Sequence, residues 1–106
     1  MRTEIKIYEG DKNYNLNFTL QDNSGTAIDI TGASLQFKAQ KAGDTALAVD
    51  RAMQIDTGAS GTCHYQVQDG DFTEGNYHAE IEVTFSSSEI ATFGDIIIRV
   101  KGDLPK

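Results

Sequence analysis

Three carboxylates in the segment Asp69-Gly70-Asp71-Phe72-Thr73-Glu74 are the first residues whose spacing suggests chemistry, because together they could gather around a calcium ion. Calcium takes about six to eight oxygen ligands, and the long loop between two helices that usually supplies them is absent from this sequence. Asp and Gly are also favoured in tight turns for conformational reasons. The sequence therefore predicts a turn here and leaves calcium binding by Asp69, Asp71 and Glu74 as an open alternative.

A second candidate is the run Asp56-Thr57-Gly58-Ala59, which has the letters of the catalytic turn in retroviral-type aspartic proteases. Those enzymes work as dimers in which one Asp from each subunit shares a proton with the other, so a single copy per chain would be enough. The flanks differ from that pattern, since Gln54 stands where an apolar residue is preferred and no glycine-rich flap hairpin is clearly placed. A polar turn is the favoured interpretation, and a dimeric protease using Asp56 is the less favoured one.

Cys63, His64 and His78 could in principle contribute to a zinc site, which needs a tetrahedral set of ligands. The alternation of apolar and polar residues places both histidines outward and Cys63 inward, so the three are not expected to converge. Cys63 is the only cysteine, which excludes an intramolecular disulfide. We predict a buried, inert thiol, two solvated imidazoles and no metal or cofactor.

Serine chemistry and glycosylation have equally weak signals. The sequence has no Gly-x-Ser-x-Gly elbow, and Ser86-Ser87-Ser88 is expected at the tip of a hairpin. Asn17-Phe18-Thr19 matches a glycosylation acceptor but falls within an expected strand. No catalytic, cofactor-binding or metal-binding residue is predicted, and the chain is not expected to be an enzyme.

Strict alternation with a period of two is the strongest structural signal, and it predicts half-buried strands. It recurs around Leu16 to Leu20, Leu35 to Ala39, Cys63 to Val67 and Tyr77 to Phe85. Further strands are expected over Thr3 to Tyr8, as a short piece near Ala27 to Ile30, as a pair around Thr45 to Ile55, and from Ile90 to Lys101, where Gly94-Asp95 suggests a bulge. The inward set is predicted to run through Phe18, Phe37, Tyr65, Tyr77 and Ile81.

Polar turn residues separate these strands, at Asp22 to Gly25, Lys41 to Asp44, Asp56 to Gly61, Asp69 to Asp71 and Ser86 to Ser88. About seven to nine short strands without helical crossovers predict an antiparallel β-sandwich. The sequence around Gly75-Asn76-Tyr77 favours the immunoglobulin-like arrangement, because a Tyr that opens a long strand can bond back to the loop before it as a tyrosine corner. We expect one all-β domain over residues 1–106, of a size at which roughly 65% of the surface of the unfolded chain can be hidden.

The charge and hydropathy of the sequence limit the kinds of partner that it can have. The net charge is −7, with acidic residues scattered along the chain, so binding to nucleic acid is not expected. The longest apolar run is Ile96-Ile97-Ile98, which is too short to cross a membrane. The first residues lack the apolar core of a secretory signal, which predicts synthesis and folding in a cytoplasm.

Several segments taken together resemble the immunoglobulin-like N-terminal domain of the phage baseplate upper protein family. They are Glu9-Gly10-Asp11, Asn15 to Asp22, Gly25, Ile28 to Lys38, Gly61 to Val67, Asp71-Phe72, Gly75 to Phe85 and Ile96 to Lys101, and the most distinctive is Asp29-Ile30-Thr31-Gly32-Ala33. The resemblance covers nearly the whole chain. It implies a stand-alone virion protein or one domain of a longer tail protein.

The resemblance implies a non-enzymatic structural module of a phage tail or baseplate that works through contacts with other tail proteins, and it leaves self-association open. The sandwich would display loops at its ends and strand edges at its sides. Acidic outward residues such as Glu80 and Glu82 would favour partners with basic patches. The alternative is a carbohydrate- or cell-surface-binding domain, for which Tyr8 and Tyr14 would be candidate stacking residues since the chain has no Trp.

Overall fold

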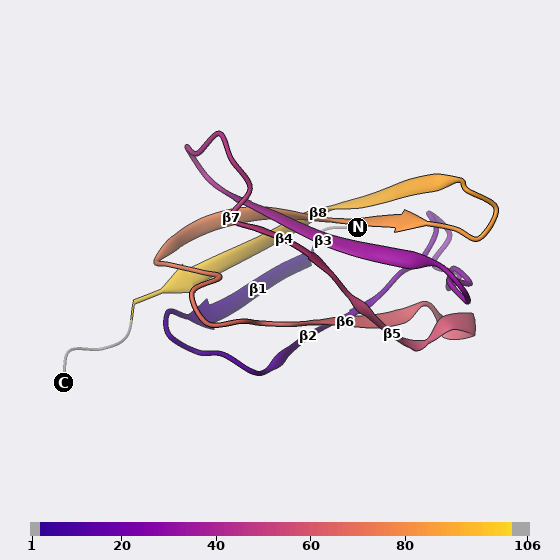
Figure 1. Ribbon diagram of the computed structural model, residues 1–106, viewed down its shortest axis with the longest axis horizontal. Helices are drawn as coiled ribbons and strands as arrows, with labels where there is room; N and C mark the ends of the chain where they lie inside the picture. Colours follow the sequence, from indigo (N-terminus) through magenta and orange to yellow (C-terminus); the bar gives the residue numbers. More distant parts are fainter. Residues whose placement is uncertain (1–2, 103–106) are drawn as a thin grey trace.

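The computed structural model, which describes residues 3–102, shows two β-sheets packed face to face (Figure 1). Eight strands are present among these residues, together with one short 3-10 turn. They are β1 (Thr3–Tyr8), β2 (Asn15–Thr19), β3 (Ser34–Lys41), β4 (Val49–Ala52), β5 (Gln54–Thr57), η1 (Gly58–Ser60), β6 (Thr62–Gln66), β7 (Gly75–Thr84) and β8 (Ile90–Lys101). None of the described residues forms a helix long and apolar enough to cross a membrane.

The strand order is that of an immunoglobulin-like sandwich. The larger sheet has the order β1-β8-β7-β3-β4 and the smaller sheet the order β2-β6-β5. Strands β3, β7 and β8 occupy the places of strands C, F and G, β4 adds to them as C′ does in variable-type domains, and the smaller sheet corresponds to B, E and D. All pairs are antiparallel except β1 with β8, which is parallel. The predicted all-β sandwich is confirmed.

The core lies between the two sheets and is built by the alternation that the sequence shows. On β7 the side chains alternate between exposed or half-buried and fully buried along most of the strand. The Phe37 ring stacks on the Tyr65 ring of the opposite sheet, with centroids 4.7 Å apart and planes 8° apart, and the Phe18 centroid lies 6.0 Å from that of Phe37. Tyr77 and Ile81 are also buried, so the predicted inward set is confirmed.

The expected bulge in the last strand is present. Ala79 pairs with Ile96 and Ile81 pairs with Phe93, so two residues of β8, Gly94 and Asp95, lie opposite one residue of β7. Asp95 has a φ of 64°, a conformation that Asp tolerates better than most residues. The hairpin between β7 and β8 turns at the three serines as predicted, with the Ser88 N–H donating to the Phe85 carbonyl at 2.8 Å.

The predicted strand near Ala27 to Ile30 is wrong. A single antiparallel bridge joins Gln21 to Ala27, and the chain then leaves the ladder. The turn between the bridged residues is held by Asp22 Oδ1, which accepts hydrogen bonds from the N–H groups of Ser24 and Thr26 at 2.9 and 3.0 Å. The Ile28 N–H still donates to the Leu20 carbonyl, but the Ile30 N–H donates to the Gly58 carbonyl at 2.9 Å, so the chain does not continue as a strand. Ile30 is nevertheless fully buried, which explains its apolar type.

The stretch from Thr45 to Gly61 also differs from expectation in its details. The expected pair of strands around Thr45 to Ile55 is two shorter strands, β4 and β5, which belong to different sheets and are separated by the buried Met53. Asp56 and Thr57, expected in a turn, continue β5, and the turn itself is the 3-10 segment η1. Gly58 passes so close to Thr31 that an added Cβ would lie 2.6 Å from its hydroxyl oxygen, which requires glycine there.

Candidate functional site

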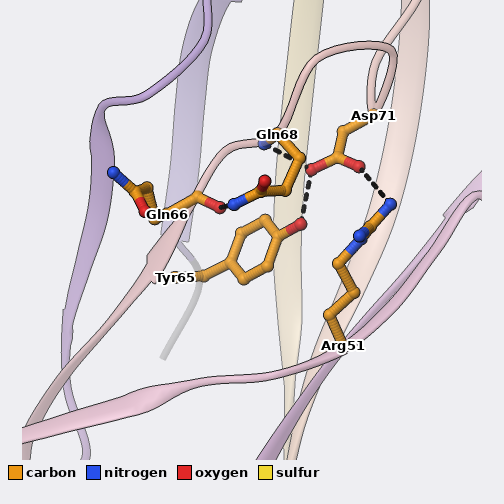
Figure 2. Close-up of polar contacts among 5 residues, drawn as sticks. All are labelled: Arg51, Tyr65, Gln66, Gln68 and Asp71. Atoms are coloured by element: carbon orange, nitrogen blue, oxygen red, sulfur yellow. Dashed lines mark hydrogen bonds and ion pairs between the residues drawn. The ribbon is translucent and has the colours of Figure 1, made fainter.

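Asp71 is a buried charged residue between the two sheets, and it is the centre of a polar cluster (Figure 2). Its Oδ2 accepts hydrogen bonds from the Tyr65 hydroxyl and from the Gln68 N–H, the latter at 2.8 Å. Its Oδ1 lies 3.4 Å from Nη2 of Arg51. The cluster joins β4 of the larger sheet, β6 of the smaller sheet and the turn that follows β6.

The positions of these residues follow from strand periodicity. Arg51 is on the same face of β4 as the buried Val49, so its side chain points between the sheets, yet it is 54% exposed because β4 is an edge strand. Burial, followed by the hydrogen bond to Asp71, raises the pKa of Tyr65, so the phenol remains a protonated donor. Sequence reasoning missed this cluster, although the spacing from Val49 to Arg51 to Met53 already placed Arg51 inward.

The three carboxylates considered for calcium do not come together. Asp71 is occupied by the cluster, whereas the Asp69 side chain is 79% exposed and lies 3.7 Å from the ammonium nitrogen of Lys12. Glu74 is exposed, and its backbone N–H donates to Glu9 Oε2 at 2.9 Å. Between residues 3 and 102 no group of three His, Cys, Asp or Glu side chains could hold a metal ion. The predicted turn is present, with the Asp71 N–H donating to the Gln68 carbonyl.

Asp56 lies beside His64 on the outer face of the smaller sheet. The register of β5 and β6 shifts between Ile55 and Thr57, and Asp56 Oδ1 lies 2.7 Å from His64 Nδ1. His64 was predicted to be simply solvated, but its side chain is 21% exposed and bonded to this carboxylate. The reason is cross-strand placement, because His64 pairs with Gln54 and Asp56 lies two residues further along the same outer face of β5, within reach of the imidazole.

Cys63 is on the opposite face of β6 from His64, and His78 is in the other sheet. Cys63 points into the core and is fully buried, as predicted, and burial together with the nearby Asp56 charge raises its pKa to about 11. His78 is exposed on β7, in the other sheet. The structure therefore separates the three residues that could have formed a zinc site.

Cys63 should resist thiol reagents in the folded protein. Because the thiolate is the reactive form, burial and a raised pKa both slow alkylation. The pKa of Cys63 is about 11 in the folded protein, against a reference value of 9.0. Folding therefore favours the protonated thiol, and its contribution to the free energy of unfolding, about 2 kcal/mol, is fully present below about pH 9. That contribution is lost as the pH rises toward 11. Urea melts of the wild type and Cys63→Ala between pH 8 and 11 should show a flatter alkaline decline in the variant. If the stability of the two proteins falls equally steeply with pH, the raised pKa of Cys63 is contradicted.

Tyr77 forms the predicted tyrosine corner. Its hydroxyl oxygen accepts a hydrogen bond from the Thr73 N–H at 2.9 Å and lies 3.2 Å from the Thr73 carbonyl, to which it donates. The ring packs edge-on against Phe72, with centroids 5.0 Å apart. The phenol thus ties the start of β7 to the loop that precedes it, four residues upstream.

The outer face of the larger sheet carries a shallow hollow of about 690 Å³ over β3, β4 and β7. Its charged side chains are mostly paired with one another. Lys38 Nζ lies 3.4 Å from Glu82 Oε2, and the Gln36 side-chain amide donates to Asp50 Oδ1 at 2.9 Å. Glu82 is therefore engaged within the sheet, whereas its neighbour Glu80 is exposed.

The tyrosines do not gather as an exposed stacking platform. Tyr65 and Tyr77 are in the core, and the Tyr14 ring packs against the core with its hydroxyl buried. Tyr8 is 52% exposed at the end of β1. The aromatic pair considered for sugar binding, Tyr8 and Tyr14, thus consists of one displayed ring and one half-buried ring.

Comparison with known proteins assigns the chain to a family. No curated protein shows significant similarity to the chain. The family described as the BppU N-terminal domain matches residues 1–104, which is nearly the whole chain and includes both sheets and the Asp71 cluster. The chain therefore belongs to the BppU N-terminal domain family, the N-terminal domains of baseplate upper proteins, which are structural proteins of the bacteriophage tail.

Proposed function

We propose that this chain is a non-enzymatic assembly module of the phage baseplate, folded as one domain over residues 1–106 and held in place by protein–protein contacts. The observation that carries the proposal is that the polar side chains suggestive of chemistry serve the fold itself. Asp71 satisfies Tyr65 and the turn after β6, and Asp56 is bonded to His64. Membership in the BppU N-terminal domain family indicates that the assembly would be the phage baseplate.

The mechanism is rigid display. A sandwich offers loops at its two ends and strand edges at its sides, and neighbouring proteins dock on them. Among the described strands, β1 and β4 end the larger sheet, and β2 and β5 end the smaller sheet. The stacked core behind them keeps these edges in fixed positions, so docking needs little reorganisation of the domain.

The charge of the chain indicates the kind of partner. With a net charge of −7 and Glu80 exposed on the larger sheet, the module suits neighbours that present basic patches. Complementary charges of this kind raise the association rate more than they raise affinity, and salt screens them. Association of the purified chain with tails that lack it should therefore slow as salt increases.

The proposal is tested by following a tagged chain through phage assembly. We expect the chain in purified tail particles at a fixed copy number, with gold-labelled antibody against the tag located at the baseplate. A tagged, unrelated sandwich domain expressed at the same level is the control and should be absent from the particles. If the chain is also absent from tails that assemble normally, it is not a baseplate module.

A further inference from the structure

The four strand edges of the sandwich are not equally protected. Exposed edges invite pairing with another chain, and proteins commonly block them with charges, bulges or inward-pointing charged residues. Strand β1 carries Glu4 and Lys6, β4 carries the inward-pointing Arg51, and β5 has the irregularity at Asp56. Strand β2 (Asn15–Thr19) has no charge, proline or glycine, and its ladder with β6 is regular.

The backbone of β2 presents a regular set of hydrogen-bonding groups at this edge. The Tyr14 carbonyl accepts at 2.9 Å and the Leu20 N–H donates at 2.8 Å, both toward the β6 side. The backbone N–H and C=O groups of successive residues point to opposite sides of a strand, so those of Asn15, Asn17 and Thr19 point away from β6. In the described part of the chain, no other strand pairs with that side of β2.

A cleft of about 670 Å³ lies between the sheets beside the same edge. Strand β1 pairs with β8 only from Ile96 onward, so among the described residues the earlier half of β8 is left uncovered on this side. Apolar residues of both sheets line the cleft, namely Phe18, Leu20, Ile81, Phe93 and Ile96. A strand added to β2 would point every second side chain into this space, on the same face as Phe18.

The rim of the cleft is acidic. Asp22 and Asp95 line it, and none of the Lys or Arg residues between positions 3 and 102 does. Hydrogen bonds from Ser24 and Thr26 hold the pKa of Asp22 below its ordinary value, so this carboxylate is charged at neutral pH. A second copy of a chain with net charge −7 would be repelled, whereas a segment that carries Lys or Arg would be attracted.

We propose that the open edge of β2 receives an extended segment of a neighbouring baseplate protein. The segment adds a fourth strand to the smaller sheet, inserts alternate apolar side chains into the cleft beside Phe18 and Phe93, and places a Lys or Arg near Asp22 or Asp95. This inference rests on the proposed function and names the surface through which it would operate.

The sharpest variant is Asn17→Pro. Proline is tolerated in an edge strand where the N–H faces away from the ladder, so the change removes an edge donor without removing a bond to β6. The matched control is Ala52→Pro on β4, whose N–H also faces an open edge because the next residue, Met53, donates to Leu35. In competition with wild type, we expect Asn17→Pro to be depleted from tails about tenfold and Ala52→Pro to be incorporated normally.

Hydrogen exchange on the wild-type chain gives a readout that does not depend on how well the variants fold. On assembly, the amides of Asn15, Asn17 and Thr19 should become protected, while the outward amides of β4 should keep their free-state rates. In the charge arm, Asp95→Asn, which tolerates the same positive φ, should weaken association about twofold to fivefold.

The outcomes separate the two proposals. A chain that enters tails without protection of the β2 amides, or whose Asn17→Pro variant is folded and incorporated like wild type, overturns the strand-addition inference and leaves the baseplate role standing. Protection that appears in pure chain at high concentration identifies the occupant as a second copy and also overturns it. A chain absent from tails removes the baseplate role itself.

Discussion

Replacing Phe37 by alanine should lower the free energy of unfolding by about 3–5 kcal/mol. Phe37 is completely buried, stacks on Tyr65 and lies next to Phe18, so truncation leaves a cavity that two strands from opposite sheets cannot close. A domain of this size has about 5–15 kcal/mol of stability in all, so the variant should unfold at a much lower urea concentration. Urea melts followed by circular dichroism and by tyrosine fluorescence would measure the change.

The control for this prediction is Thr92→Ala on β8. Thr92 is exposed on the outer side of the same sheet, so its truncation should change stability by less than about 0.5 kcal/mol. Phe18→Ala, at the edge of the same aromatic group, is expected to cost about 3 kcal/mol, toward the lower end of the range for Phe37. A surface-like cost at Phe37 would show that the two sheets are not packed through these rings.

Local pattern was sufficient for the strands that alternate strictly. The alternating stretch Leu35 to Ala39 lies within β3, and the facing of β7 follows its alternation residue by residue. Prediction failed where the backbone bonds to a residue distant in the sequence. The residues near Ala27 make one bridge and no strand, because the Ile30 N–H donates to the carbonyl of Gly58.

Among the contacts of the candidate site, sequence predicted the local ones and missed those between distant segments. The tyrosine corner joins Tyr77 to Thr73, four residues away, and such a local bond is readable from sequence. The Asp71 cluster joins residues from β4, β6 and a turn, and no single segment contains its pattern. Turn composition accounted for Asp71 without requiring a buried role, because Asp is favoured in turns whether or not its carboxylate is covered.

The second large effect is expected at that cluster. Asp71→Ala should lower the free energy of unfolding by about 2–4 kcal/mol, because it removes a charged hydrogen bond and leaves the buried Tyr65 hydroxyl and the Gln68 N–H without their acceptor. Asp71→Asn keeps one acceptor oxygen and should lose less. Tyr65→Phe keeps the ring stacked on Phe37 but leaves the buried carboxylate one donor short, at a cost of about 1.5–3 kcal/mol.

The contribution of the ion pair can be separated with Arg51→Met, which keeps an unbranched apolar stem between the sheets and removes the charge. The Arg51 side chain is 54% exposed, so solvent screens its attraction to Asp71 and the loss should stay below about 1 kcal/mol. A double-mutant cycle between Asp71 and Tyr65 should then show a larger coupling than one between Asp71 and Arg51. If Arg51→Met lowers the free energy of unfolding as much as Asp71→Ala does, the ion pair with Arg51, and not the hydrogen bond from Tyr65, would be the main interaction that stabilises the buried carboxylate.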